Sequence, residues 1–156
     1  MRFSKLVKKK NIFSELECDE REGVLREMIG NLAKNGDIGE DCLDKVLEGL
    51  MSRERLGTTG IGKGIAIPHV RSDDFDGVVI AVGRSSGGID FAAVDGERVK
   101  LVFLILAPES KQDDYMAALR WVSTVGRDEY NNKLLLGATT AAGFVELFAD
   151  IEEQSQ

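Results

Sequence analysis

The only histidine of the chain, His69, is the side chain whose surroundings most suggest chemistry. It follows Pro68 and the short apolar run 65–67, and four glycines precede that run within eight residues. A neutral imidazole is available as a nucleophile near neutral pH, because its ordinary pKa is about 6.5. Glycines let backbone N–H groups approach an anion closely, and loops often carry functional side chains. A lone histidine is usually a core residue with its hydrogen bonds satisfied. These features argue against that usual case, so a structural and a functional role of His69 are equally supported at this point.

The glycine-rich segment resembles two nucleotide-binding motifs but satisfies neither. Residues 57–63 match the first seven positions of a P-loop, whereas the eighth, where Ser or Thr holds magnesium, is Gly64. A P-loop also follows a strand and opens a helix, whereas this segment follows a predicted helix and enters a strand. The dinucleotide pattern G-x-G-x-x-G fails because Ile65 stands at its last glycine position. We therefore expect no nucleotide cofactor.

The elements that position this segment follow from apolar periodicity and turn residues. Strands are predicted at 11–16, 65–67, 78–82, 89–91 and 99–106, and helices at 19–36, 40–52, 113–125, 129–136 and 140–148. Asp19 is the expected N-cap of the first helix, Gly36 its stop, and residues 87–88 a turn. The run 99–106 is almost wholly apolar, which predicts a central strand covered on both faces. The fold class is α/β: one mixed sheet flanked by helices on both faces.

Length and composition indicate one soluble domain over residues 1–156. The net charge of the chain is −7. The first ten residues carry +5, so residues 11–156 carry −12. An acidic body repels a phosphate backbone, which argues against nucleic-acid binding. The basic segment 1–10 has the charge to dock on an acidic surface or anionic lipid, but a solvated, frayed tail is the favoured interpretation.

The chain shows no sign of membrane insertion or export. Its longest apolar run, 101–106, is far too short to span a bilayer, and no signal segment opens the sequence. We therefore expect a cytoplasmic protein. Cys18 and Cys42 lack metal-ligand spacing, so reduced, partly buried thiols are expected.

Residues 53–69, RERLGTTGIGKGIAIPH, resemble the active-site signature of the type-2 EIIA domains of the phosphotransferase system (PTS). This is the fructose, mannitol and nitrogen-regulatory family, and the similarity extends over residues 13–148. The resemblance implies a mannitol-specific IIA-like fold in which His69 accepts a phosphoryl group from the carrier protein HPr. The group then passes to a IIB domain, usually onto a cysteine, or acts as a regulatory signal. Donor and acceptor are protein side chains, so neither a metal nor another cofactor is expected.

The resemblance also assigns residues around the phosphoryl group. Arg53 matches the family's active-site arginine, and its planar guanidinium suits phosphoryl oxygens. The alternative for Arg53 is a solvated charge favoured by the helix dipole at a helix end. Thr58 and Thr59 have hydroxyls that could donate to the phosphate, or they simply shape the turn.

One position departs from the family. Members commonly have a second histidine at the start of the helix after the Ala-Pro turn, and Tyr115 stands there in this chain. A phenol donates a hydrogen bond but carries no positive charge. We predict that Tyr115 lies near His69 and helps fix the imidazole or a phosphoryl oxygen. Asp113 and Asp114 are expected to cap the helix rather than face the site.

Two functions remain open at this point. One is a working phosphocarrier that feeds a sugar permease; the other is a non-catalytic regulatory module that binds target proteins. The lack of IIB, IIC or HPr segments in this sequence and the missing second histidine favour the nitrogen-regulatory branch. An enzyme acting on a small molecule is weakly supported, because its base would have to be a carboxylate or a lysine.

Overall fold

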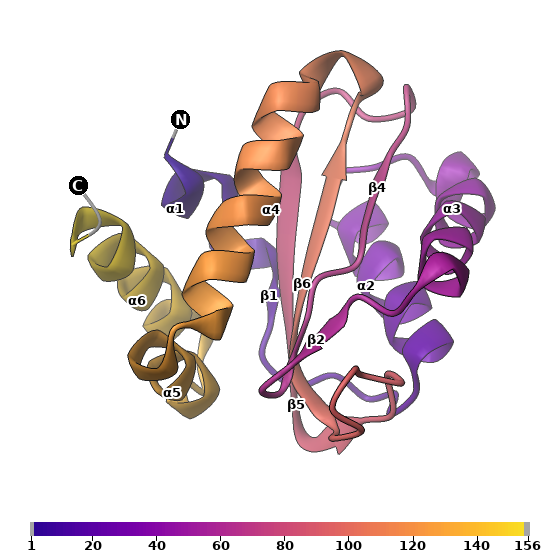
Figure 1. Cartoon of the computed structure of the whole chain (residues 1–156). Helices are drawn as coiled ribbons and strands as arrows, with labels where there is room; N and C mark the ends of the chain where they lie inside the picture. Colours follow the sequence, from indigo (N-terminus) through magenta and orange to yellow (C-terminus); the bar gives the residue numbers. More distant parts are fainter. Residues whose placement is uncertain (1, 155–156) are drawn as a thin grey trace.

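The structure is a computed structural model that describes residues 2–154. A mixed sheet forms the centre of the molecule (Figure 1). The strands are β1 (Ile12–Phe13), β2 (Gly60–Gly62), β3 (Ile65–Ala66), β4 (His69–Arg71), β5 (Val79–Ile89) and β6 (Val99–Ala107). Their order is β1-β5-β6-β3-β2, and β4 also pairs with β6. β6 is antiparallel to β5 and parallel to β3 and β4. Eight of the nine residues of β6 are buried, which confirms the predicted central strand.

Helices cover both faces of this sheet. They are α1 (Phe3–Leu6), α2 (Arg21–Lys34), α3 (Leu43–Leu56), α4 (Gln112–Arg127), α5 (Glu129–Gly137) and α6 (Ala141–Gln154). In Figure 1, α2 and α3 lie on one side of the sheet, and α1, α4, α5 and α6 lie on the other. Short 3₁₀ turns occupy Lys9–Asn11, Glu40–Cys42 and Glu109–Lys111. The predicted fold class, a mixed sheet between two helical layers, is confirmed. No helix among the described residues is both long enough and apolar enough to cross a membrane.

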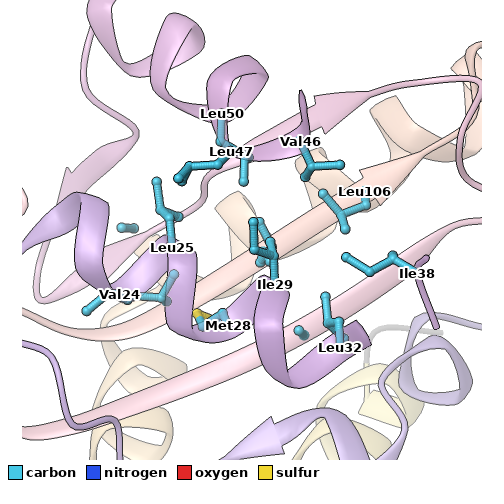
Figure 2. Packing of buried hydrophobic residues seen from close by; sticks show 14 of the residues in the cluster. Val24, Leu25, Met28, Ile29, Leu32, Ile38, Val46, Leu47, Leu50 and Leu106 are labelled. Carbon is cyan, nitrogen blue, oxygen red and sulfur yellow. The ribbon is translucent and has the colours of Figure 1, made fainter. Parts of the chain in front are cut away.

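The apolar stripes of α2 and α3 pack together over one face of the sheet, as Figure 2 shows. The labelled side chains are Val24, Leu25, Met28, Ile29, Leu32, Ile38, Val46, Leu47, Leu50 and Leu106. Each fully buried side chain of this size contributes about 1.5–3 kcal/mol. This packing holds α3 against the sheet and thereby fixes the C-terminal end of α3, where Arg53 lies.

Several predicted boundaries are wrong. β5 continues to Ile89 instead of stopping at Val82, and the predicted turn at 87–88 lies inside it. A register shift between Arg84 and Ile89 absorbs the glycines, and Gly88 takes a φ of 86°. Of the predicted strand 89–91, only Ile89 belongs to a strand, while Asp90 forms an isolated bridge. The N-cap of α2 is Glu20, not Asp19, because its carboxylate accepts from two backbone N–H groups.

The basic N-terminal segment is not frayed over residues 2–10, which corrects the expectation. The carboxylate of Glu152 in α6 accepts hydrogen bonds from the backbone N–H groups of Phe3 and Ser4. The Phe3 ring also stacks on Trp121, with the two ring centroids 5.3 Å apart. Trp121 on α4 and the buried carboxylate of Glu152 on α6 therefore hold the segment in place. Both partners are distant along the chain, so a sequence pattern does not reveal them.

Candidate functional site

His69 is placed by a break in the strand that runs beside β6. Ala66 pairs with Val102 and His69 pairs with Ile105, so both flanking strands keep one register along β6. Between them, Pro68 has no N–H to donate, although its carbonyl accepts from Ile105 N at 3.0 Å. Residues 67–68 therefore interrupt the strand, which resumes at His69 as β4. In Figure 1, β4 lies between α3 and α4.

Alternation along β4 decides which helix His69 faces. Val70 packs into the core under α2 and α3, where Gly49 leaves room for its methyl group. Side chains alternate along a strand, so His69 and Arg71 point to the opposite side, toward α4. The aromatic contact between the His69 and Tyr115 rings agrees with this direction.

A single hydrogen bond fixes the imidazole of His69. Its Nδ1 lies 2.7 Å from the carbonyl oxygen of Ile67. A carbonyl oxygen only accepts hydrogen bonds, so Nδ1 carries the proton of the neutral ring. The lone pair then lies on Nε2, and the side chain is only half-buried. Nε2 is therefore the ring nitrogen whose lone pair is available to an electrophile.

Burial lowers the pKa of His69 below its ordinary value, and the positive charge of Arg53 lowers it further. The hydrogen bond to Ile67 and the charge of Glu54 oppose this shift but do not reverse it. The ring is therefore neutral at pH 7, the state in which Nε2 is a nucleophile.

We predict that an NMR titration of the imidazole gives a midpoint below 6.5. His69 is the only histidine, so its ring signals are unambiguous. Because the pKa is lowered in the folded state, the stability contributed by neutral His69 is complete above pH 6.5 and is lost as pH falls through the folded-state pKa. Arg53→Gln should move the midpoint upward. A midpoint above 6.5 in the unsubstituted protein would contradict the prediction.

Tyr115 lies beside His69, in the first turn of α4, as the sequence predicts. The ring centroids are 5.9 Å apart and the ring planes are inclined by 60°. Burial raises the pKa of Tyr115 to about 12, so its hydroxyl stays protonated near neutral pH. No hydrogen bond of this hydroxyl is found within residues 2–154, and the imidazole is held by Ile67 instead. The phenol is thus a free donor at the edge of the site.

Asp113 and Asp114 lie in the first turn of α4 but do not cap it. The N-cap position is Lys111, and no side chain accepts a hydrogen bond there. The expected capping role of the aspartates is therefore wrong. Their charges still suit the positive end of the helix dipole, which explains acidic residues in a first turn.

Arg53 sits in the last turn of α3 and reaches toward the loop that leads to His69. Its Nη1 donates to the carbonyl oxygen of Gly57 at 2.8 Å, which fixes the guanidinium at the helix end. Its charge adds to the lowering of the His69 pKa and opposes the raising of the Tyr115 pKa by burial, so it acts on both rings of the site. Arg53 therefore combines the two interpretations from the sequence: it caps the helix end and supplies positive charge to the site.

The two threonines are engaged with other partners. The Thr59 hydroxyl donates to the buried carboxylate of Glu54, which also accepts from Thr59 N at 2.9 Å. The Thr58 hydroxyl donates to the Phe91 carbonyl oxygen at 3.2 Å. A hydroxyl has one proton to donate, so in this structure both threonines shape the loop and neither has a proton left for a phosphate.

Glu54 anchors this loop from inside. It is 3% exposed, and besides Thr59 it pairs with Arg21 of α2 at 3.6 Å. A buried carboxylate with these partners ties the end of α3 to the loop and to α2. The sequence analysis did not single out Glu54, because a glutamate between two arginines at a helix end resembles a solvated residue.

We predict that Glu54→Gln lowers the free energy of unfolding by about 2 kcal/mol, since it leaves Arg21 without its charge partner. Urea denaturation measures the loss. The matched control is Glu48→Gln on the same helix, whose side chain is 69% exposed and pairs with Arg55. That change should alter stability by less than about 0.5 kcal/mol. Equal effects of the two substitutions would show that Glu54 does not anchor the loop.

Arg71 is a site residue that the sequence analysis missed. Its guanidinium carbon lies 5.5 Å from the centroid of the Tyr115 ring. It also donates to Gln112 Oε1 and pairs with Glu109 at 3.5 Å. The signal that was present is the spacing of two from His69 on a strand, which puts both side chains on one face.

Lys63, the lysine of the failed P-loop match, has a structural position. It occupies the turn between β2 and β3 with a φ of 57°. Its Nζ donates to the Arg127 carbonyl oxygen, at the C-terminal end of α4, at 3.1 Å. An ammonium there is favoured by the helix dipole and satisfies a terminal carbonyl. The lysine therefore joins the hairpin to α4.

Comparison with known proteins gives one family and two kinds of relatives. A family model described as phosphoenolpyruvate-dependent sugar phosphotransferase system, EIIA 2, matches residues 5–151. The fructose-specific EIIABC component of Bacillus subtilis strain 168 is 35% identical over 94% of this chain, which spans 23% of that protein. A nitrogen regulatory protein of Bradyrhizobium diazoefficiens is 32% identical over 96% of this chain and 95% of its own length.

Solved structures agree on the fold. The nitrogen regulatory protein IIA-Ntr of Neisseria meningitidis superposes with a TM-score of 0.83 at 24% identity, covering 94% of this chain and 98% of its own. The Escherichia coli complex of mannitol IIA with phosphorylated mannitol IIB gives a TM-score of 0.73 at 21% identity. That match covers 92% of this chain and 99% of the other.

Proposed function

The chain belongs to the EIIA type-2 family of the sugar phosphotransferase system, and we propose that it carries a phosphoryl group on Nε2 of His69. The observation that carries the proposal is the hydrogen bond from Nδ1–H to the Ile67 carbonyl, which leaves the lone pair on Nε2. The proposed donor is the phosphohistidine of an HPr-type carrier in the cytoplasm. No nucleotide or metal takes part, since both reacting atoms belong to protein side chains.

The transfer forms one N–P bond and breaks another. The Nε2 lone pair attacks phosphorus in line, and the donor imidazole leaves with the electron pair of its own N–P bond. The His69 ring becomes positively charged as the bond forms, because Nδ1 keeps its proton. The Ile67 carbonyl, 2.7 Å away, stabilises that developing charge, and Arg53 stabilises the phosphoryl oxygens. Positioning and charge compensation are what such a loose transition state requires.

The proposed next step is transfer to a IIB domain or use of the phosphorylated state as a regulatory signal. The first is supported by a neighbouring structure that pairs mannitol IIA with phosphorylated IIB. The second is supported by the similarity to nitrogen regulatory proteins and by Tyr115 at the position of the second histidine. A non-catalytic module that binds a regulatory target is the alternative function.

The proposal is tested by incubating the protein with phosphoenolpyruvate, enzyme I and HPr. Intact-mass analysis should show one added phosphoryl group, which acid removes. Adding a cognate IIB domain should then discharge the protein, whereas a purely regulatory protein keeps the group. A protein that stays unmodified, while a known EIIA domain in the same mixture is phosphorylated, would exclude the carrier function and leave the binding module.

A further inference from the structure

The charges of two arginines, Arg53 and Arg71, act on Tyr115, and the proposed function uses only Arg53. The Tyr115 ring contacts the His69 ring, and the guanidinium of Arg71 lies over the Tyr115 ring. The positive charges of Arg71 and Arg53 both act on the phenol. A phosphoryl group on His69 would bring nearly two negative charges into this half-buried region. We infer that Arg71 is a second phosphoryl-binding arm, which pairs with the phosphoryl group on His69 after transfer; this inference rests on the proposed function.

The position of Arg71 in β4 gives it the required reach. It lies two residues after His69 on the same face of the strand, which puts the two Cα atoms about 7 Å apart. An arginine side chain is long enough to cover that separation along the strand. Its planar guanidinium offers paired N–H donors to phosphoryl oxygens, which a lysine at the same position would not match.

The present partners of Arg71 hold it only weakly. Its ion pair with Glu109 joins side chains that are 34% and 55% exposed, and Gln112 contributes a neutral acceptor. Exposed pairs of this kind contribute little to stability, because water and salt screen them. A dianionic phosphoryl group competes well against one exposed carboxylate. Arg71 is therefore held beside the site in the unphosphorylated protein, and it can turn to the phosphoryl group once His69 is phosphorylated.

This role also accounts for Tyr115. A tyrosine at that position has no positive charge, whereas Arg71 brings a permanent one to the same ring. The phenol then acts as a flat platform for the guanidinium and as a neutral donor to the phosphoryl oxygens. The positive charge that an imidazole at position 115 would supply comes instead from β4.

The experiment measures the phosphorylated fraction and the half-life of phosphohistidine, with phospho-HPr and with phosphoramidate as donors. Because phosphoramidate requires no protein docking, an effect seen with both donors lies at the phosphoryl group. Arg71→Gln should lower the fraction and the half-life about tenfold, the loss of one charged hydrogen-bonded contact. Arg71→Lys should restore part of the loss, and Glu109→Gln should raise the fraction, because it frees Arg71.

Two further variants sharpen the test. Arg84→Gln is the matched control: Arg84 lies on β5 and pairs with Glu15, so its replacement should leave the phosphorylated fraction unchanged. Tyr115→His in the Arg71→Gln background should recover phosphorylation, because a partly protonated imidazole replaces the missing charge. If the unsubstituted protein is phosphorylated and Arg71→Gln equals it, the inference is wrong and the proposed function stands. If neither donor phosphorylates the unsubstituted protein, the proposed function fails and the inference fails with it.

Discussion

Replacing His69 by glutamine is expected to abolish phosphorylation completely. The chain has no other histidine, and an amide nitrogen has no lone pair that attacks phosphorus. The glutamine NH₂ group can still donate to the Ile67 carbonyl, which now receives a bond from Nδ1. The loop should therefore keep its shape while the chemistry disappears. Intact-mass analysis after incubation with phosphoenolpyruvate, enzyme I and HPr measures the outcome.

The control for this experiment is the stability of the variant. His69 is only half-buried, so His69→Gln should leave the thermal midpoint within a few degrees of the unsubstituted protein. A well-folded variant that still gains an acid-labile phosphoryl group would overturn the assignment of His69. In that case the acceptor would have to be a side chain other than histidine.

Replacing Arg53 by glutamine is expected to slow phosphoryl transfer from phospho-HPr about a hundredfold, the effect of removing one preorganised charged donor. The charge of Arg53 acts on both rings of the site: it adds to the lowering of the His69 pKa by burial, and it opposes the raising of the Tyr115 pKa by burial. Arg53→Lys should recover little, because an ammonium does not reproduce the fork that spans two phosphoryl oxygens. Single-turnover quench measurements give the rate without interference from enzyme I.

Arg55→Gln is the matched control, two residues away on the same helix. Arg55 pairs with Glu48 through side chains that are 58% and 69% exposed. Its loss should change the transfer rate less than about twofold, as expected for a screened surface charge. If both substitutions slowed transfer equally, the basic end of α3 would act in docking HPr, and Arg53 would have no special role at the phosphoryl group.

The local signals in the sequence predicted the frame of the site well. The apolar run 99–106 indicated a central strand, and β6 is that strand, buried along both faces. The signature 53–69 predicted that a helix end, a glycine-rich turn and His69 follow one another, as α3, β2, β3 and β4 do. The family resemblance implied that Tyr115 lies near His69, and the ring contact with His69 agrees. The central strand depends on hydrophobic pattern, and the order of the signature depends on residues close together in the chain; a sequence expresses both directly.

Contacts between distant segments were decided only by the tertiary structure. Arg71 contacts Glu109, Gln112 and Tyr115 because β4 lies parallel to β6, which pairs Arg71 with Ala107 at the end of β6. The three partners follow directly after β6 in the chain, in the turn before α4 and in its first turn. The Thr59 hydroxyl is taken by Glu54 because α3 brings a buried carboxylate under the loop. Nε2 of His69 keeps its lone pair because the fold places the Ile67 carbonyl within hydrogen-bond distance of Nδ1. The sequence by itself pointed to His69 as the proposed phosphoryl acceptor, since that assignment depends on side-chain type and on the resemblance of the local motif. Which atom reacts, and which charges surround it, depends on three-dimensional packing, because hydrogen bonds and ion pairs form between groups that only the folded chain brings within reach.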